Sequence, residues 1–149
     1  MTHQLNFIYN DSDWIAPAEY PDLSKATEIA IDLETKDPNI KTKGPGWATF
    51  DGHIVGFAVA ALGQQWYFPI AHDAGGNMDL SITCAWMQDI LKTDATKIFH
   101  NASYDVGWLL VNGFEIRGKI VDTMIAAAII NENRFSFSLN ACAKDYLGE

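Results

Sequence analysis

Ile29-Ala-Ile-Asp-Leu-Glu-Thr35 is the stretch of sequence that decides the fold. It overlaps the segment Glu28–Glu34, whose β-branched and apolar residues are typical of a buried strand. Asp32 and Glu34 are two positions apart, so on a strand both carboxylates project from the same face. A charge at the end of a buried run is costly unless it is paired or bound to a metal. The stretch therefore predicts a buried strand that presents two acids to one site.

The acid-x-acid spacing is weak on its own. With 19 acidic residues in 149, two acids that are two positions apart, as the period of a strand requires, are expected about 2.4 times by chance. It occurs at Asp11/Asp13 and at Asp32/Glu34. Because the first pair lies in a polar segment and the second ends an apolar run, we take Asp32 and Glu34 as the functional candidates.

The remainder of the chain alternates short strands with helical segments. A predicted loop covers 36–52, and Gly63-Gln64 is predicted to turn a hairpin. Further strands are predicted at 54–61, 65–70 and 97–100, with an edge strand at 115–121. One helix is predicted to begin at Asp79 or Ser81, and three more are predicted at 101–112, 122–131 and 137–147. Later strands can return parallel through crossover helices, so we expect an α/β fold with a mixed sheet flanked by helices.

The first 26 residues differ in composition from the rest. They are polar, contain Pro17 and Pro21, and carry the aromatics Phe7, Tyr9, Trp14 and Tyr20. We interpret 1–26 as an N-terminal arm laid over a domain that occupies 27–149. We expect the aromatics of the arm to cover the core rather than to stack on bases.

Composition limits the class of protein. The length suits a single domain, and the net charge of −9 argues against nonspecific binding to phosphate backbones or anionic membranes. The N-terminus has no secretory signal and the apolar stretches are too short to cross a bilayer, so we expect a cytoplasmic protein without membrane contact. Cys84 and Cys142 lack metal-ligand spacing and are expected to be buried thiols.

A third acid follows the strand predicted at 97–100. Asp105 lies in the first turn of the helix after His100-Asn101, where the positive end of the helix dipole favours the ionised carboxylate. Complementing the dipole would by itself explain this residue. Together, however, Asp32, Glu34 and Asp105 offer hard oxygen ligands, which Mg²⁺ or Mn²⁺ prefers and zinc does not.

Ile29–Thr35 resembles the first motif, and His100-Asn-Ala-Ser-Tyr-Asp105 the second motif, of the DEDD 3′–5′ exonucleases. The most similar group is the proofreading domain of family A DNA polymerases, of the bacterial polymerase I type and its phage versions. Supporting similarity runs through 67–72, 113–118, 121–124 and 139–148. The motifs occur in the family's order and the similarity covers about 27–148.

The resemblance implies an RNase H-like fold and a two-metal mechanism that releases 5′-mononucleotides from single-stranded DNA 3′ ends. It implies that Asp32 and Glu34 bind the metal that activates the attacking water, and that Asp32 bridges to a second ion. Asp105 would hold that second ion through its water shell. Thr35, Asn101 and Tyr104 would line the groove for the terminal nucleotides, Asn101 by hydrogen bonding and Tyr104 by packing.

One part of the family's pattern is missing. The third motif, Tyr-x-x-x-Asp or His-x-x-x-Asp, does not occur after Asp32, and its spacing occurs once, at Tyr9 and Asp13 in the polar arm. We therefore expect a fragment that ends before the third motif, weak or inactive alone, which a later segment or another chain completes. A polymerase domain is the expected partner in the full-length protein.

Other polar residues have simpler interpretations, and other functions remain open. We expect Asp122 to be a helix N-cap, His72 and His100 to be hydrogen-bonding residues, and Asp37, Asp51 and Asp73 to be solvated loop charges. The alternatives to DNA proofreading are an RNase D-like enzyme that trims RNA 3′ ends and a noncatalytic nucleic-acid-binding module that retains the fold.

Overall fold

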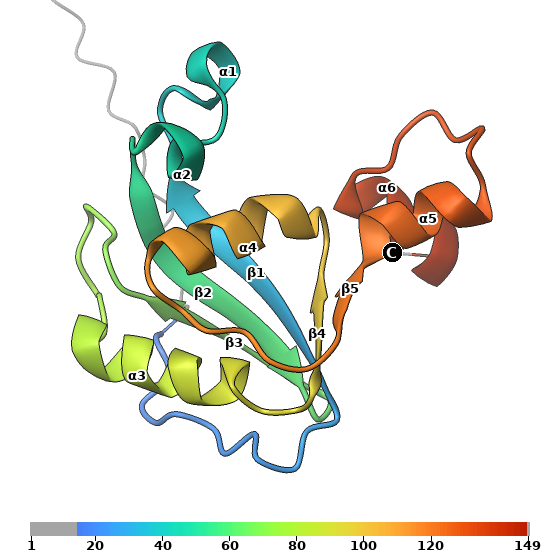
Figure 1. Cartoon of the computed structure of the whole chain (residues 1–149). Coiled ribbons are helices and arrows are strands. Elements are labelled where there is room, and N and C mark those ends of the chain that lie inside the picture. Colours follow the sequence, from blue (N-terminus) through green and yellow to red (C-terminus); the bar gives the residue numbers. More distant parts are fainter. Residues whose placement is uncertain (1–14, 149) are drawn as a thin grey trace, which may run out of the picture.

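The computed structural model describes residues 15–148. Its centre is a five-stranded sheet with the order β3-β2-β1-β4-β5 (Figure 1). The strands are β1 (Glu28–Lys36), β2 (His53–Ala61), β3 (Gln64–Pro69), β4 (Thr96–Phe99) and β5 (Ile120–Asp122). β1 pairs antiparallel with β2 and parallel with β4, β2 pairs antiparallel with β3, and β4 pairs parallel with β5. The predicted mixed α/β architecture is thereby confirmed.

Six helices accompany the described part of the sheet. They are α1 (Ile40–Lys43), α2 (Gly46–Thr49), α3 (Leu80–Leu91), α4 (Ala102–Val111), α5 (Thr123–Ile130) and α6 (Leu139–Leu147). α3 and α4 lie across one face of the sheet, and α1 and α2 stand beyond the end of β1 (Figure 1). α5 and α6 form a separate lobe next to β5. The prediction of a plain loop over 36–52 is wrong, because that segment contains α1 and α2.

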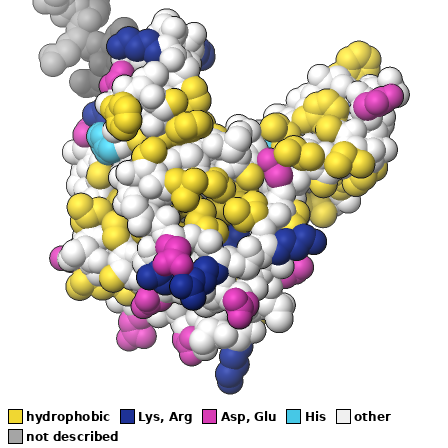
Figure 2. Space-filling model, in the orientation of Figure 1, with side chains coloured by type: hydrophobic (Ala, Val, Ile, Leu, Met, Phe, Trp, Pro, Cys, Tyr) yellow, Lys and Arg dark blue, Asp and Glu magenta, His cyan; other side chains and the backbone are white. Residues whose placement is uncertain are grey.

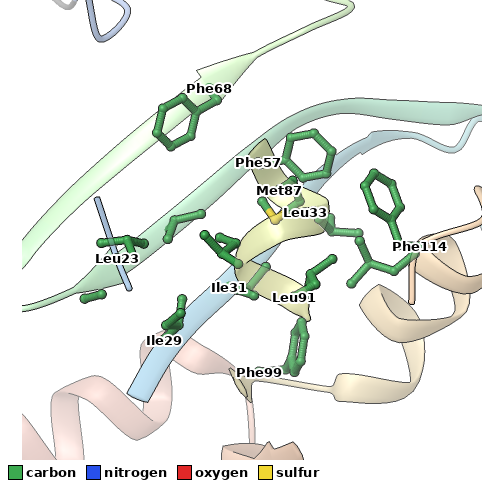
Figure 3. Packing of buried hydrophobic residues seen from close by; sticks show 14 of the residues in the cluster. Leu23, Ile29, Ile31, Leu33, Phe57, Phe68, Met87, Leu91, Phe99 and Phe114 are labelled. Carbon is green, nitrogen blue, oxygen red and sulfur yellow. The ribbon is translucent and has the colours of Figure 1, made fainter. Parts of the chain in front are cut away.

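The hydrophobic core lies between the sheet and the helices α3 and α4 (Figure 3). Ile29, Ile31 and Leu33 of β1 all point into it and are at most 6% exposed. The alternate side chains of β1, including Asp32 and Glu34, therefore lie on the opposite face of the sheet, as the period of a strand requires. This alternation separates the part of β1 that stabilises the fold from the part that is free for chemistry.

The described part of the predicted arm belongs to this core. The Tyr20 ring stacks on Phe68 with centroids 5.6 Å apart, and its hydroxyl is 2.7 Å from the hydroxyl of Thr83 on α3. Leu23 is 2% exposed. These residues cover the core, as expected; Phe7, Tyr9 and Trp14 lie outside the described residues.

The buried face of α4 includes a charged residue. Leu109 is fully buried and Leu110 is 58% exposed, whereas Asp105 is only 3% exposed. Helical periodicity places apolar residues inward, and α4 instead turns a carboxylate toward the sheet. No helix among residues 15–148 is long and apolar enough to span a membrane.

Candidate active site

The site begins at the carboxyl end of β1, where its pairing with β2 changes register. Glu34 lies opposite Gly56, whereas Thr35 lies opposite Ile54, so Val55 is the extra residue of a β-bulge. The Val55 carbonyl accepts hydrogen bonds from the amides of both Ile70 and Ala71. A bulge bends its strand and redirects the side chains next to it. It therefore bends β2 opposite the point where β1 passes from Glu34 to Thr35.

Asp105 reaches β1 from the start of α4. Its Oδ1 accepts a hydrogen bond of 3.0 Å from the backbone amide of Leu33, the residue between Asp32 and Glu34. β4 pairs with β1 only as far as Ala30, so beyond that point the edge of β1 is open on this side. The Asp105 carboxylate satisfies the Leu33 amide there, which places it on the residue between the two acids of β1 and within electrostatic reach of Asp32.

Burial and neighbouring charge disfavour ionisation at this position. Burial, and further the negative charges of Asp32 and Asp122, raise the pKa of Asp105 to about 7, although the Leu33 amide favours the ionised form. Burial also raises the pKa of Asp32, against the opposing effect of His100. Asp32 and Asp105 thus interact electrostatically, as two carboxylates that share a site do.

Glu34 has neighbours that the sequence interpretation missed. Tyr67 of β3 places its hydroxyl over Gly56, where an added Cβ would lie 2.0 Å from it, and Gly56 is the residue opposite Glu34. The Tyr67 hydroxyl is hydrogen bonded to Nε2 of His72. Burial and the charge of Glu34 raise the pKa of Tyr67 to about 12. A glycine opposite an acidic strand residue was the available signal, because glycine within a strand often marks close approach.

Asp122 fixes the start of α4. Its carboxylate accepts hydrogen bonds from the amides of Asn101 and Ala102, at 3.1 and 2.8 Å, and from those of Met124 and Ile125, at 2.9 and 3.3 Å. These amides outweigh the effect of burial and lower the pKa of Asp122. The predicted N-cap is confirmed, and the same side chain also holds the first residues of the helix that carries Asp105.

The structure brings two of the three expected groove residues into contact. The hydroxyls of Thr35 and Tyr104 are 2.8 Å apart, and the Tyr104 hydroxyl donates to Oδ2 of Asp37 at 3.0 Å. Asn101 lies three residues before Tyr104 in a left-handed conformation, and its side-chain oxygen accepts from Ser103. Asn101 therefore stands at the start of α4, separate from the Thr35–Tyr104 pair.

The three loop aspartates are not alike. The expectation that Asp37 is solvated is wrong: its Oδ2 also accepts from the Gly46 amide at 2.8 Å, while its Oδ1 is buried without a hydrogen-bond partner among the described residues. Asp51 is half-buried and accepts from Asn39. Asp73 is exposed and pairs with Lys36 at 2.9 Å.

His100 connects the site to the α5–α6 lobe. Its Nδ1 lies 2.9 Å from the Thr123 hydroxyl, and its Nε2 lies 2.8 Å from the Phe137 carbonyl. A carbonyl can only accept, so Nε2 carries a proton. His100 is therefore the hydrogen-bonding residue that was expected, and it orients the segment that leads into α6.

A hollow of about 750 Å³ lies on the face of the sheet that carries Asp32. Its floor consists of small residues of β1 and β2, and Tyr67, His100 and Leu139 stand around it. The neighbouring lobe exposes Ile125, Ile129, Ile130, Leu139 and Leu147, and Figure 2 shows apolar side chains over its surface. This face of the sheet thus combines an acid with apolar surface.

The donors at this site suit a hard divalent cation in kind, because they are carboxylates whose mutual repulsion a cation would relieve. No three His, Cys, Asp or Glu side chains in residues 15–148 lie close enough to enclose one ion. The side chains as they stand therefore supply suitable ligands without forming a closed ligand set.

Comparison with known sequences gives a clear match. Residues 18–148 match a family model described as a 3′–5′ exonuclease of DNA polymerase A. The chain is 33% identical over 145 residues to a DNA-directed DNA polymerase of Pseudomonas phage M6. The match covers 93% of this chain and 22% of the phage polymerase, so the chain spans about a fifth of that relative's length.

Solved structures support the same fold. Brucella melitensis NrnC with bound Mg²⁺ is 18% identical with a TM-score of 0.61, over 86% of this chain and 57% of NrnC. Escherichia coli RNase D, an exoribonuclease involved in structured RNA processing, is 20% identical with a TM-score of 0.60, over 85% of this chain and 29% of RNase D. The sheet and its helices are thus RNase H-like.

Proposed function

The chain belongs to the 3′–5′ exonuclease family of family A DNA polymerases, and from this premise we propose that it trims single-stranded DNA from the 3′ end. The reaction would be metal-dependent hydrolysis that releases 5′-mononucleotides. Asp32, Glu34 and Asp105 would carry the chemistry, and Thr35, Asn101 and Tyr104 would bind the terminal nucleotides.

The observation that carries this proposal is the hydrogen bond from the Leu33 amide to Asp105. It holds a carboxylate from α4 against the residue that separates the two acids of β1. Burying a carboxylate on the core side of a helix costs free energy unless the group is satisfied. A neutral amide side chain would satisfy the Leu33 amide without burying a charge, so a carboxylate at this position favours a functional role.

Asp32, Glu34 and Asp105 would hold two Mg²⁺ or Mn²⁺ ions. When bound, such ions activate water and stabilise the attacking and leaving oxygens of a phosphodiester. The protein's part is to supply ionised carboxylates, and the raised pKa of Asp105 means that ion binding would displace a proton near neutral pH. Asp122 would contribute indirectly, because it fixes the first turn of α4.

We further propose that the missing third motif comes from outside these 149 residues, either from a later segment of a polymerase chain or from another chain. No Tyr or His after Asp32 is followed by Asp four positions later. The hollow beside Asp32 and the exposed apolar residues of the lobe offer room and surface for such a segment. On this proposal the 149-residue chain alone is weakly active or inactive.

The test uses a chain extended through its natural coding sequence to the third motif. With Mg²⁺ or Mn²⁺ it should release 5′-mononucleotides from a 3′-labelled single-stranded oligonucleotide, and Glu34→Gln should abolish release. The matched control is Glu28→Gln, an exposed acid at the opposite end of β1. Robust turnover by the unextended chain would contradict the need for a third motif.

An RNA substrate is the second candidate, and the likeness to RNase D is the observation that favours it. Competition between equimolar DNA and RNA oligonucleotides, each with its own fluorophore, separates the two. We expect the DNA to be shortened first. Preferential loss of RNA would replace the DNA proposal, and metal-indifferent binding without cleavage of either strand would indicate a noncatalytic module.

A further inference from the structure

Residues 36–50, which we term the knuckle, rise from the end of β1 directly after Thr35 (Figure 1). They contain α1 and α2. Asp37 links the knuckle to α4, because one of its carboxylate oxygens accepts hydrogen bonds from both the Gly46 amide of α2 and the Tyr104 hydroxyl of α4. The knuckle is thus tied to the same Tyr104 that contacts Thr35.

Two tryptophans interlock the knuckle with α4. An added Cβ at Gly107 of α4 would lie 2.4 Å from the Trp47 ring, and one at Gly46 would lie 2.9 Å from the Trp108 ring. Each glycine therefore packs directly against the indole of the other segment, and the Cβ of any larger residue would clash with that ring. The knuckle is thus packed closely against α4.

The outer side of the knuckle carries an aromatic ring that the fold does not use. Phe50 is 92% exposed and adopts φ +55°, a conformation that is a genuine outlier for a bulky residue. This conformation closes α2, since the Phe50 amide donates to the Gly46 carbonyl as the C-cap of the helix, and it leaves the ring in solvent where a ligand can contact it. Gly52, two residues later, abuts the carbonyl of Lys36, so the segment that carries Phe50 returns to the end of β1.

Cations lie on the same segment. Lys36, Lys41 and Lys43 are three of the ten Lys and Arg residues in a chain of net charge −9. No acid in residues 15–148 pairs with Lys41, and the exposed Lys43 lies 3.8 Å from the half-buried Asp51. Exposed ion pairs contribute little stability, so a phosphate can take the place of Asp51.

We propose that the knuckle binds single-stranded DNA upstream of the 3′-terminal nucleotide, with a base stacked on Phe50 and backbone phosphates on Lys41 and Lys43. This rests on the proposed function. The combination of an exposed aromatic with cations is how proteins hold single strands without reading sequence, because every base has a π-face and every nucleotide a charge. Figure 2 shows the molecule hollowed between the knuckle and the α5–α6 lobe, which leaves the knuckle accessible.

The stacking contact is tested by binding of a 5′-fluorescein-labelled dT12 oligonucleotide to the 149-residue chain in EDTA, followed by fluorescence anisotropy. Phe50→Ala should weaken binding about five-fold or more, as loss of one base–aromatic stack does. Leu62→Ala is the matched control: Leu62 is also an exposed apolar residue at positive φ, 58% exposed with φ +53°. Leu62 lies in the turn between β2 and β3, at the end of β2 away from the knuckle, so its loss should leave binding unchanged.

The charge contact is tested by salt dependence. The logarithm of the binding constant falls as the logarithm of the salt concentration rises. The double variant Lys41→Gln/Lys43→Gln should reduce the magnitude of this slope by about 1.4 for a single strand, because two phosphate contacts are lost. The control Lys25→Gln/Lys119→Gln removes two exposed cations near the amino-terminal ends of β1 and β5 and should leave the slope unchanged.

Equal effects of Phe50→Ala and Leu62→Ala, an unchanged slope in the lysine double variant, or no binding by the unmodified chain would each overturn the inference. Its outcome is independent of cleavage. If the extended chain cleaves DNA while these variants bind normally, the inference fails and the proposed function stands. If binding depends on the knuckle but the extended chain does not cleave, the proposed function fails and the binding surface stands.

Discussion

The titration of Asp105 should make the stability of the metal-free chain depend on pH. Its pKa is raised from 3.8 to about 7 in the folded state, mainly by burial, and its side chain is 3% exposed. Between these two values the folded chain holds a proton that the unfolded chain has lost. The contribution of Asp105 to the free energy of unfolding should therefore be highest below pH 4, fall as the pH rises, and reach its lower value above about pH 7.

The magnitude follows from the displacement of the pKa. A change of one in pKa corresponds to about 1.4 kcal/mol. The rise in the pKa of Asp105 from 3.8 to about 7 therefore changes the free energy of unfolding by at most about 4 kcal/mol. That is a large part of the 5–15 kcal/mol typical of a domain. Asp105→Asn keeps the size of the side chain and an oxygen for the Leu33 amide, but it cannot titrate.

The assay is urea unfolding monitored by circular dichroism in EDTA, at intervals from pH 4 to pH 8, for the unmodified chain and for Asp105→Asn. Taking the difference between the two removes the contribution of all other titrating groups. We expect the variant to become more stable than the unmodified chain as the pH rises, by up to about 4 kcal/mol. A difference that stays constant across this range would refute the claim that Asp105 is buried next to other acids.

Three further changes test the supports of the site. Asp122→Ala removes hydrogen-bond acceptors from the starts of both α4 and α5 and should lower the free energy of unfolding in urea by about 2–4 kcal/mol. This is about twice the effect expected of Asp79→Ala, which removes the cap of α3 alone. Equal losses in the two variants would argue against a double cap. Gly107→Ala should destabilise by about 1–3 kcal/mol through overpacking against Trp47, whereas a gain in melting temperature, as helix propensity alone predicts, would show that the knuckle is not interlocked. Tyr104→Phe should cost about 1–3 kcal/mol, because it removes the partner of Thr35 and Asp37, and an unchanged urea midpoint would contradict that network.

Much of the fold follows from local sequence. The alternation in Ile29–Glu34 indicated which side chains of β1 are buried, and Asp79, Asp122 and Gly148 mark the ends of helices as capping rules predict. These features are encoded within a few residues of where they act, so no knowledge of the tertiary structure is needed to find them.

The site departs from these rules for a physical reason. The helix dipole, which would explain Asp105 from the sequence alone, does not account for its burial: Asp105 is on the buried side of α4, where the Leu33 amide, 72 residues earlier in the chain, is its partner. Tyr67 and Asp37 were missed for the same reason. Their roles depend on Gly56 and on Tyr104, contacts that local periodicity does not report.

The candidate acids of β1 follow from the strand spacing and the apolar run that precedes them, and the motif adds their proposed role. Asp32 and Glu34 stand on the face of β1 opposite the core, as the spacing predicted, while the contact of Asp105 with the Leu33 amide between them required the fold. That both acids and Asp105 act as one centre stays a prediction.

The most direct test of that centre is the digestion of a 5′-labelled single-stranded DNA by the extended chain, resolved nucleotide by nucleotide on a sequencing gel. In Mg²⁺ or Mn²⁺ the account predicts a ladder that shortens from the 3′ end, which EDTA, Asp32→Ala and Asp105→Ala each abolish. A ladder that persists in either variant would contradict the account.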